Sequence, residues 1–155
     1  MRFISIFLAL LLATPVSAET TTATATVGAP AIRLLHLKIA GHVLSAEVAH
    51  TQAARSQGLM YRHSMKENSG MLFVFPEASR HSMWMVNTNI PLSVAFVDET
   101  GAILNIADMA PHTETAHSAA GAAKYAVETN FGWFRARGIK AGNRIMGLGK
   151  APPAE

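Results

Sequence analysis

The amino-acid sequence predicts an α+β fold, mainly antiparallel, in which a small sheet curls into an open barrel accompanied by two short helices. The first observation is that about seven short segments have the apolar alternation, or the continuous apolar composition, of β-strands. The second is that only two segments, both short, carry helix signals. The third is that no helix of about ten residues or more is predicted, and parallel α/β sheets use such helices to connect their strands.

The N-terminus has the features of a secretory signal peptide over residues 1–18. Arg2 supplies a positive start, and the apolar run over residues 3–13 is broken at Pro15. Small residues then offer a cleavage site after Ala18. Because the apolar run is too short to span a bilayer, we expect a mature protein that keeps no membrane span and is periplasmic or secreted.

The remaining chain divides into three parts by composition. Residues 19–31 are rich in Thr and Ala, with too little apolar bulk to bury, which predicts a flexible leader. Residues 32–150 hold all the predicted strands and helices and are expected to form a single domain. The composition of residues 151–155 predicts a disordered tail.

The composition excludes several classes of protein. The chain contains no Cys, which rules out disulfides, thiol nucleophiles, iron–sulfur clusters and zinc sites built from thiolates. The formal net charge is +3 and falls by one when Arg2 leaves with the signal peptide. No run of Lys and Arg interleaved with aromatic residues occurs, so nucleic acid is not an expected partner. No cofactor is predicted, and the oligomeric state stays open.

The domain begins with a predicted β-hairpin. Apolar residues alternate with polar ones over 35–39 and again over 44–48, which is typical of half-buried strands. Gly41-His42 provides the turn between them.

A short helix is predicted next, over Gln52–Gln57. Thr51 before it is a good N-cap, and Gly58 after it can take the backbone conformation that ends a helix. A helix this short is marginal alone, so we expect packing onto the sheet to hold it.

The middle of the domain is the stretch around which the rest is expected to pack. Met71–Phe75 is continuously apolar, as in a strand covered on both faces. A second strand over residues 82–86 would place Met83 and Met85 on one face. A third over residues 92–98 alternates, and we expect these three strands to form the centre of the sheet.

The C-terminal half predicts three further strands and the second helix. The strands are expected at 102–107, 125–128 and 144–148, with a turn at 99–101 and a loop over 111–121. Asn130 is expected to cap the helix, in which Phe131 and Phe134 lie three residues apart on one face.

Several short motifs occur together in one order along the domain. They are Glu47-Val48-Ala49, Arg55-x-x-Gly58-Leu59-Met60-x-Arg62, Gly70-Met71-Leu72-Phe73-x-Phe75, Met83-Trp84-Met85-x-Asn87-Thr88-x-Ile90-Pro91-Leu92, Phe96-x-Asp98, Glu128-Thr129-Asn130-x-Gly132-Trp133 and Gly142-Asn143. With these motifs, from about Leu35 to Gly147, the chain resembles the domain of unknown function 192 family, which consists of small exported or envelope proteins of bacteria and archaea. The resemblance implies a compact β-rich domain and no agreed activity.

The chain departs from the pattern of that family at three positions. Val86 stands where family members often carry Lys, and Ser93 and Asn143 stand where they often carry Asp. The departures weaken any catalytic role for these three positions in this chain.

Six polar residues are the candidates for a ligand site: Arg55, Arg62, Asn87, Thr88, Asp98 and Glu128. In one interpretation they line a pocket in which the Arg side chains bind a carboxylate or phosphate and the Asn-Thr pair orients the ligand. In the other, which the sequence favours, Arg pairs with Glu128 or Asp98 and ties the helix to the sheet. The leading hypothesis for function is non-catalytic binding of a small polar or anionic ligand near Arg55, Arg62, Asn87 and Thr88.

Two further functions compete with that hypothesis. A periplasmic copper-binding protein could use the thioethers of Met83 and Met85, which suit Cu(I), although Met also fills apolar cores and core packing is the favoured role. A hydrolase could use Asp98 and Glu128 as an acid and base pair. The sequence lacks a G-x-S-x-G nucleophile motif and a phosphate-binding glycine loop, so an enzyme is the weaker prediction.

The loop segment His112-x-Glu114-x-x-His117 superficially resembles a metal motif. Its two His residues are five apart, so a helix would not place them on one face. We therefore expect a solvated loop there.

Overall fold

The computed structural model describes residues 34–155, so the predicted signal peptide and leader lie outside the described residues. The strands are β1 (Leu34–Ile39), β2 (His42–Ala49), β3 (Ser69–Ser79), β4 (Ser82–Met83), β5 (Leu92–Val97), β6 (Ile103–Met109), β7 (His117–Ser118), β8 (Ala123–Asn130) and β9 (Ile145–Met146). The helices are α1 (Gln52–Gln57), α2 (Trp133–Ala136) and the 3₁₀ helix η1 (Leu148–Lys150).

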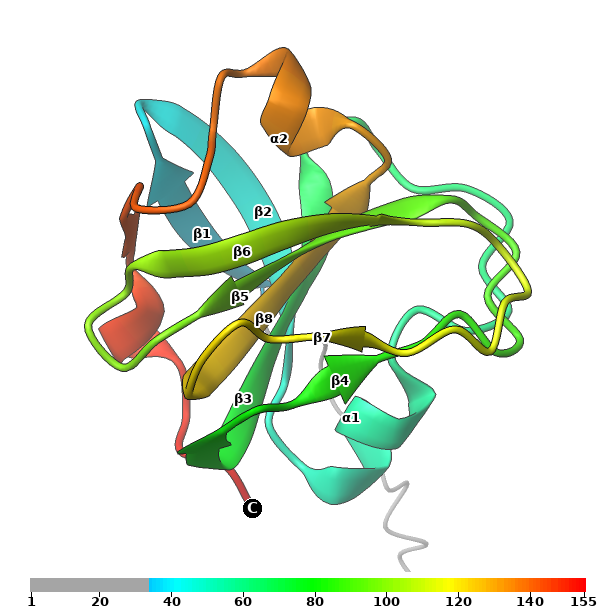
Figure 1. Ribbon diagram of the computed structural model, residues 1–155, viewed down its shortest axis with the longest axis horizontal. Helices are drawn as coiled ribbons and strands as arrows, with labels where there is room; N and C mark the ends of the chain where they lie inside the picture. Colours follow the sequence, from blue (N-terminus) through cyan, green and yellow to red (C-terminus); the bar gives the residue numbers. More distant parts are fainter. Residues whose placement is uncertain (1–33) are drawn as a thin grey trace, which may run out of the picture. The chain divides into compact units, whose positions relative to one another are not determined.

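One curled sheet dominates the domain (Figure 1). Its strand order is β6-β5-β8-β3-β2-β1-β9, and β4 and β7 form a separate two-stranded pair. All neighbours in the large sheet run antiparallel except β2 and β3. The predicted α+β class, with a mainly antiparallel barrel-like sheet and two short helices, is confirmed.

The predicted hairpin is confirmed as β1 and β2, with the turn one residue earlier than expected. Leu37 pairs with Leu44, and Ile39 pairs with His42. The two turn residues, Ala40 and Gly41, have φ angles of 47° and 88°. Two consecutive positive φ angles are typical of the tight turns whose twist matches that of the flanking strands.

The parallel pair β2–β3 was not expected from the sequence. It aligns Ala46 with Gly70 and Ala49 with Phe73. The chain returns to the start of β3 through α1 and an irregular segment over residues 58–68. A short helix with a long connection thus replaces the full-length crossover helix that parallel strands usually need.

Side chains of the three central strands alternate between two apolar clusters. The α2 core consists of Leu37, Ile39, Leu44, Ala46, Leu72, Val74, Ala95, Val97, Ile103, Val127, Trp133, Phe134, Ile139, Ile145 and Leu148. The α1 core consists of Ala49, Leu59, Met71, Phe73, Phe75, Met85, Ile90, Leu92, Val94, Phe96, Met109, Ala119, Ala123 and Ala126. Because the strands β3, β5 and β8 contribute to both clusters, they are buried on both faces, as predicted for Met71–Phe75. Helix α2 lies at one end of the sheet, and α1 lies near the β4–β7 pair at the other end (Figure 1).

The prediction of a central strand over residues 82–86 is wrong. Strand β4 ends at Met83 and pairs with β7 outside the large sheet. The chain then turns, with the backbone N–H of Thr88 donating to the carbonyl of Met85 at 3.1 Å. The position between β3 and β5 is taken by β8, whose register with both strands is continuous over residues 125–129.

The predicted cap of the second helix is also wrong. Asn130 is the last residue of β8, and its side chain donates to the backbone carbonyls of Lys66 and Glu67 at 2.8 and 3.2 Å. Helix α2 begins after Gly132, which has a φ angle of 75° and provides no side-chain cap. The polar side chain of Asn130 thus stabilises the segment before β3 instead of the helix.

The C-terminal residues contact the domain, unlike the disordered tail that composition predicts. Ala151 and Ala154 pack against the α2 core. The backbone N–H of Glu155 donates to the carbonyl of His50 at 2.8 Å. The last predicted strand shortens to β9, and η1 follows it. No helix within residues 34–155 is long and apolar enough to cross a membrane.

Candidate functional site

A pocket of about 300 Å³ opens between α1, β3 and the segment that follows β4, and we call it the Glu128 pocket. It is lined by Gln52, Arg55, Ser56, Gln57, Gly58, Leu59, Met60, Phe73, Phe75, Ser82, Met83, Trp84, Thr88 and Glu128. Of the six candidate residues from the sequence, it brings together Arg55, Thr88 and Glu128.

Glu128 lies in the middle of the sheet because of the register of β8. It pairs with Met71 of β3 on one side and with Val94 of β5 on the other. Alternation places its side chain on the same face as Ala126, toward the α1 core. The residue is 4% exposed.

Gly70 allows the backbone of β8 to approach β3 closely at Glu128. A Cβ atom at Gly70 would lie 2.2 Å from the backbone oxygen of Glu128, closer than any real side chain approaches. The absence of a side chain at Gly70 therefore permits the close β3–β8 pairing that sets the position of Glu128.

The Glu128 carboxyl lacks a partner and opens into the pocket; among residues 34–155 the one fully buried side-chain polar atom without a hydrogen bond is His50 Nδ1. Within residues 34–155 no side chain or backbone group hydrogen-bonds to it or forms an ion pair with it. Burial alone raises its pKa to about 8, because removal from water disfavours the charged form. At neutral pH the group is therefore mainly the neutral acid, which can donate one hydrogen bond and accept others.

The walls of the Glu128 pocket are apolar near the sheet and polar at the mouth. Phe73 and Phe75 present aromatic rings from β3, and the ring of His81 stacks on Phe75 with centroids 3.7 Å apart. Trp84, which lies at the mouth, is 61% exposed. Side-chain amides and hydroxyls complete the mouth, from Gln52, Ser56, Gln57 and Ser82.

Arg55 lines the pocket, but its guanidinium binds backbone oxygens. Its Nη1 donates to the carbonyl of His50 and, at 3.1 Å, to that of Val74. Its Nη2 donates to the backbone oxygen of Glu155 at 2.8 Å. Arg55 thus ties α1 to β3 and to the C-terminal residues, which is a structural role.

Arg62 lies outside the Glu128 pocket and pairs with a carboxylate that the sequence prediction did not name. Its two terminal nitrogens donate to the two carboxylate oxygens of Glu47 at 2.6 and 2.7 Å. The hydrogen bond with Glu47 raises the pKa of Arg62, against the opposing effect of burial. An Arg–carboxylate pair does tie the segment after α1 to the sheet, as the favoured interpretation expects, but through Glu47 rather than Glu128 or Asp98.

Asn87 and Thr88 form a turn beside the pocket. Asn87 is exposed, has a φ angle of 55°, and its backbone carbonyl accepts from the N–H of Tyr61 at 2.9 Å. Thr88 is buried, and its hydroxyl donates to the carbonyl of Val86 at 3.2 Å. Only Thr88 lines the pocket.

Asp98 lies far from Glu128, so the two do not form an acid and base pair. Glu128 is in register with Val94, and the four residues from there to Asp98 span about 13 Å of strand. The Asp98 carboxylate instead closes the turn after β5, accepting from Thr100 N–H at 2.8 Å and Ala102 N–H at 2.9 Å. Burial opposes its ionisation, but these hydrogen bonds outweigh burial and lower the pKa of Asp98.

Met83 and Met85 do not share a face, contrary to the sequence prediction. Met83 is partly buried and lines the Glu128 pocket. Met85 is fully buried in the α1 core. Within residues 34–155 no group of three or more His, Asp or Glu residues is arranged to hold a metal ion.

Ser93 belongs to a separate polar cluster near α2. Its hydroxyl donates to the carboxylate of Asp108, its cross-strand partner, and accepts from the N–H of Gly132 at 2.8 Å. Arg135 donates to the same carboxylate at 2.6 Å. Burial opposes ionisation of Asp108, but these contacts outweigh it and lower its pKa. The polar groups of this cluster are paired with one another. Their contacts join α2 to the sheet, which is a structural role.

Sequence reasoning missed most of the pocket walls. In the sequence Phe73 and Phe75 have only the pattern of core residues, and nothing predicts that Gln52, Gln57 and Trp84 line a pocket. One signal was present: Glu128 is an acidic residue directly after Val127 in a strand now known to be buried on both faces. An acid at such a position marks a site.

Comparisons with known proteins agree with the fold. Residues 35–147 match the model of a family described as Uncharacterized ACR (DUF192). A crystal structure from Sinorhizobium meliloti 1021, provisionally described as a transcription regulator, is 34% identical with a TM-score of 0.75, over 79% of this chain and 99% of that one. One of a protein of unknown function from Novosphingobium aromaticivorans DSM 12444 is 30% identical with a TM-score of 0.72, over 86% of this chain and 92% of that one. No functionally curated protein matches the chain.

Proposed function

The chain belongs to the domain of unknown function 192 family, and we propose that it is an exported protein that binds a small ligand with a polar head group in the Glu128 pocket. The observation that carries the proposal is the Glu128 carboxyl, which is buried at the base of a pocket and has no partner among residues 34–155. Burial makes the charged form of this carboxyl costly as long as it has no partner. A ligand that hydrogen-bonds to it removes that cost.

The pocket has the division of surfaces that small ligands use. Aromatic rings of Phe73 and Phe75 can cover an apolar body, while a single titratable group fixes the head. Of the two forms of ligand that the sequence suggests, polar and anionic, the polar form has more support. An anion would need Arg55, whose guanidinium already binds three backbone oxygens.

Binding has more support than hydrolysis. Among residues 34–155, Glu128 is the one acidic residue that lines the pocket. Glycoside hydrolysis by the usual route uses two carboxyl groups about 5 to 10 Å apart, and Asp98 lies beyond that range along the strand. Copper binding through the predicted methionine pair has no geometric support, because Met85 packs into the α1 core.

Export rests on the sequence. The N-terminal apolar run with Arg2 before it and Ala18 after it matches a secretory signal, and the absence of Cys leaves the folded domain indifferent to an oxidising compartment. In such a compartment, and without a run of Lys and Arg interleaved with aromatic residues in the sequence, the chain is not expected to bind nucleic acid. We therefore do not expect this chain to act as a transcription regulator, which is the provisional description of the Sinorhizobium meliloti protein.

Native mass spectrometry of the protein purified from a periplasmic extract tests both parts of the proposal. We expect the protein mass to correspond to cleavage after Ala18, with an additional discrete mass from a small molecule. Glu128→Leu should lose the additional mass, whereas Glu99→Gln, at an exposed turn residue, should keep it. An extra mass that persists in Glu128→Leu, or a wild-type protein that is always bare, would contradict binding in this pocket.

A further inference from the structure

The ligand of the Glu128 pocket can be assigned to a chemical class. We propose that it is a small organic cation, in which an ammonium group on an apolar body pairs with the Glu128 carboxylate. This inference rests on the proposed function, since it needs the pocket to be a ligand site.

The charged residues that line the pocket are the first support for a cationic ligand. From β8 it receives Glu128, and from α1 it receives Arg55. The lining residues from β3, β4 and the turn at Thr88 carry no charge, and the titratable ring of His81 packs on Phe75. Of the residues that the structure describes, Glu128 is therefore the one whose side chain can become negative inside the pocket.

Glu128 has no positively charged partner among residues 34–155. The raised pKa of Glu128 has burial as its only cause, so Arg55 does not act on it as a partner. The guanidinium of Arg55 is held by His50, Val74 and Glu155. An ammonium group at the base of the pocket would supply three N–H donors and a positive charge to a carboxylate that otherwise has neither.

The aromatic walls of the pocket also favour a cationic ligand. Phe73 and Phe75 line the approach to Glu128, and Trp84 lies at the mouth. The faces of aromatic rings attract cations and also cover apolar surface. A ligand with an apolar body and a cationic head group therefore fits both the aromatic walls and the Glu128 carboxyl.

Binding of such a ligand must exchange a proton. At neutral pH the free pocket holds the protonated carboxyl, and the ligand arrives as an ammonium ion. The O–H bond of Glu128 breaks, its proton goes to the buffer, and the carboxylate that remains pairs with the ammonium group. Affinity should then rise about tenfold per pH unit below the pKa of Glu128 and level off above it.

Three probes of equal size separate the classes: benzylammonium, benzyl alcohol and benzoate. Their binding can be measured by NMR shifts of the Phe73, Phe75 and Trp84 rings, and by calorimetry in buffers of different ionisation enthalpy. We expect benzylammonium to bind most tightly, with a dissociation constant that falls about tenfold from pH 6 to pH 7 and with release of close to one proton per ligand. Glu128→Gln should weaken benzylammonium at least tenfold at pH 8 and remove the pH dependence, while Glu99→Gln should change neither.

The other outcomes are distinct. If benzyl alcohol or benzoate binds as tightly as benzylammonium, or if affinity falls as the pH rises from 6 to 8, the ligand is not a cation and the pocket remains a ligand site. If none of the three shifts the ring resonances of the pocket, both the inference and the proposed function are contradicted.

Discussion

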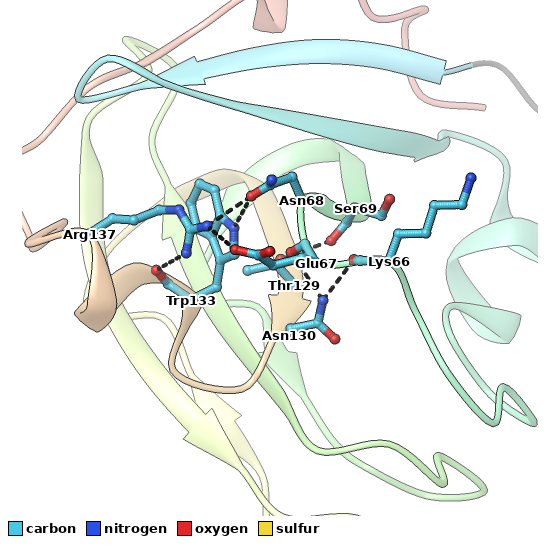
Figure 2. A network of polar contacts seen from close by, with 8 residues as sticks. All are labelled: Lys66, Glu67, Asn68, Ser69, Thr129, Asn130, Trp133 and Arg137. Carbon is cyan, nitrogen blue, oxygen red and sulfur yellow. Dashed lines mark hydrogen bonds and ion pairs between the residues drawn. The ribbon is translucent and has the colours of Figure 1, made fainter.

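Two polar regions of the molecule differ in how completely their groups are paired. One fastens the segment before β3 to α2 and consists of Glu67, Asn68, Trp133 and Arg137 (Figure 2). The other is the Glu128 pocket, which lies on the side of the α1 core. In the first each side chain has a partner, and in the second the most deeply buried acid has none within residues 34–155.

The first region is satisfied from several directions. The side-chain oxygen of Asn68 accepts from the indole N–H of Trp133 at 3.0 Å and from Arg137 at 2.9 Å. The Arg137 guanidinium lies 4.3 Å from the centre of the Trp133 ring and also donates to Glu67 at 2.9 Å. Such a network needs nothing further, so its role is structural.

In the Glu128 pocket, by contrast, the carboxyl of Glu128 has no such partner within residues 34–155. A Gln or Leu at position 128 would avoid the cost of a buried acid and keep a similar volume. A polar group with a structural role is therefore distinguished from a candidate binding group by whether it has a partner, and not by burial or charge alone. Four substitutions test this difference between the two regions, and they follow in order of decreasing expected effect.

Gly70→Ala should have the largest effect. The added Cβ would meet the Glu128 backbone at 2.2 Å and force β3 and β8 apart. We expect a loss of more than about 4 kcal/mol in the free energy of unfolding, or failure to fold. Gly149→Ala, where a Cβ meets nothing within 4 Å, is the matched control and should change stability by less than about 1 kcal/mol in urea denaturation. Similar stability of the two variants would contradict the close approach.

Glu128→Gln should raise stability in a pH-dependent way. The folded-state pKa of about 8 lies above the ordinary value of 4.5, so the folded protein retains a proton that the unfolded chain releases between these pH values. The contribution of Glu128 to the free energy of unfolding is therefore fully present below about pH 4.5. It is lost as the pH rises to 8, by about 1.4 kcal/mol per pH unit. The variant lacks this loss.

The measurement is the difference in unfolding free energy between Glu128→Gln and the wild type, from pH 4 to pH 9. It should be smallest at pH 4, grow with pH, and reach a plateau of a few kcal/mol above pH 8. A difference that does not change with pH would mean that Glu128 has a partner in the folded protein.

Asn68→Ala should lower stability without a pH signature. It leaves the buried indole N–H of Trp133 without an acceptor, which costs about 1 to 3 kcal/mol. The loss should be constant between pH 5 and pH 9, because no titrating group changes its environment. A loss that follows the titration of Glu128 would show that the two regions are coupled.

Glu67→Gln should have the smallest effect. The Glu67 side chain is 80% exposed, so its ion pair with Arg137 is screened by water and salt. We expect a loss of less than about 1 kcal/mol that becomes smaller in 1 M NaCl. A larger loss, unchanged by salt, would assign the ion pair a role in the α2 network that its exposure does not support.

Local patterns in the sequence predicted local structure well. The β1–β2 hairpin and α1 with its Thr51 cap followed from alternation and capping residues. Strand β5 followed from its apolar alternation. These features depend on neighbours in the chain, which the sequence displays directly.

Long-range pairing could not be read in the same way. Nothing near β8 indicates that it inserts between β3 and β5, so the apolar residues 82–86 looked equally suitable for the centre of the sheet. The partner of Arg62 is Glu47, 15 residues away, and the choice among carboxylates depends on the parallel β2–β3 register. Glu128 was a candidate from the sequence, but its lack of a partner appears only when the strands on both sides are in place.

The most direct test of the account is the pKa of Glu128 in the ligand-free protein, from the pH dependence of its side-chain carboxyl ¹³C shift. Selective labelling of Glu, with Glu128→Gln to assign the resonance, isolates the signal. We expect a single transition near pH 8. A transition at or below the ordinary value of 4.5 would mean that the carboxylate is ionised and paired at neutral pH, and it would contradict the proposed ligand site.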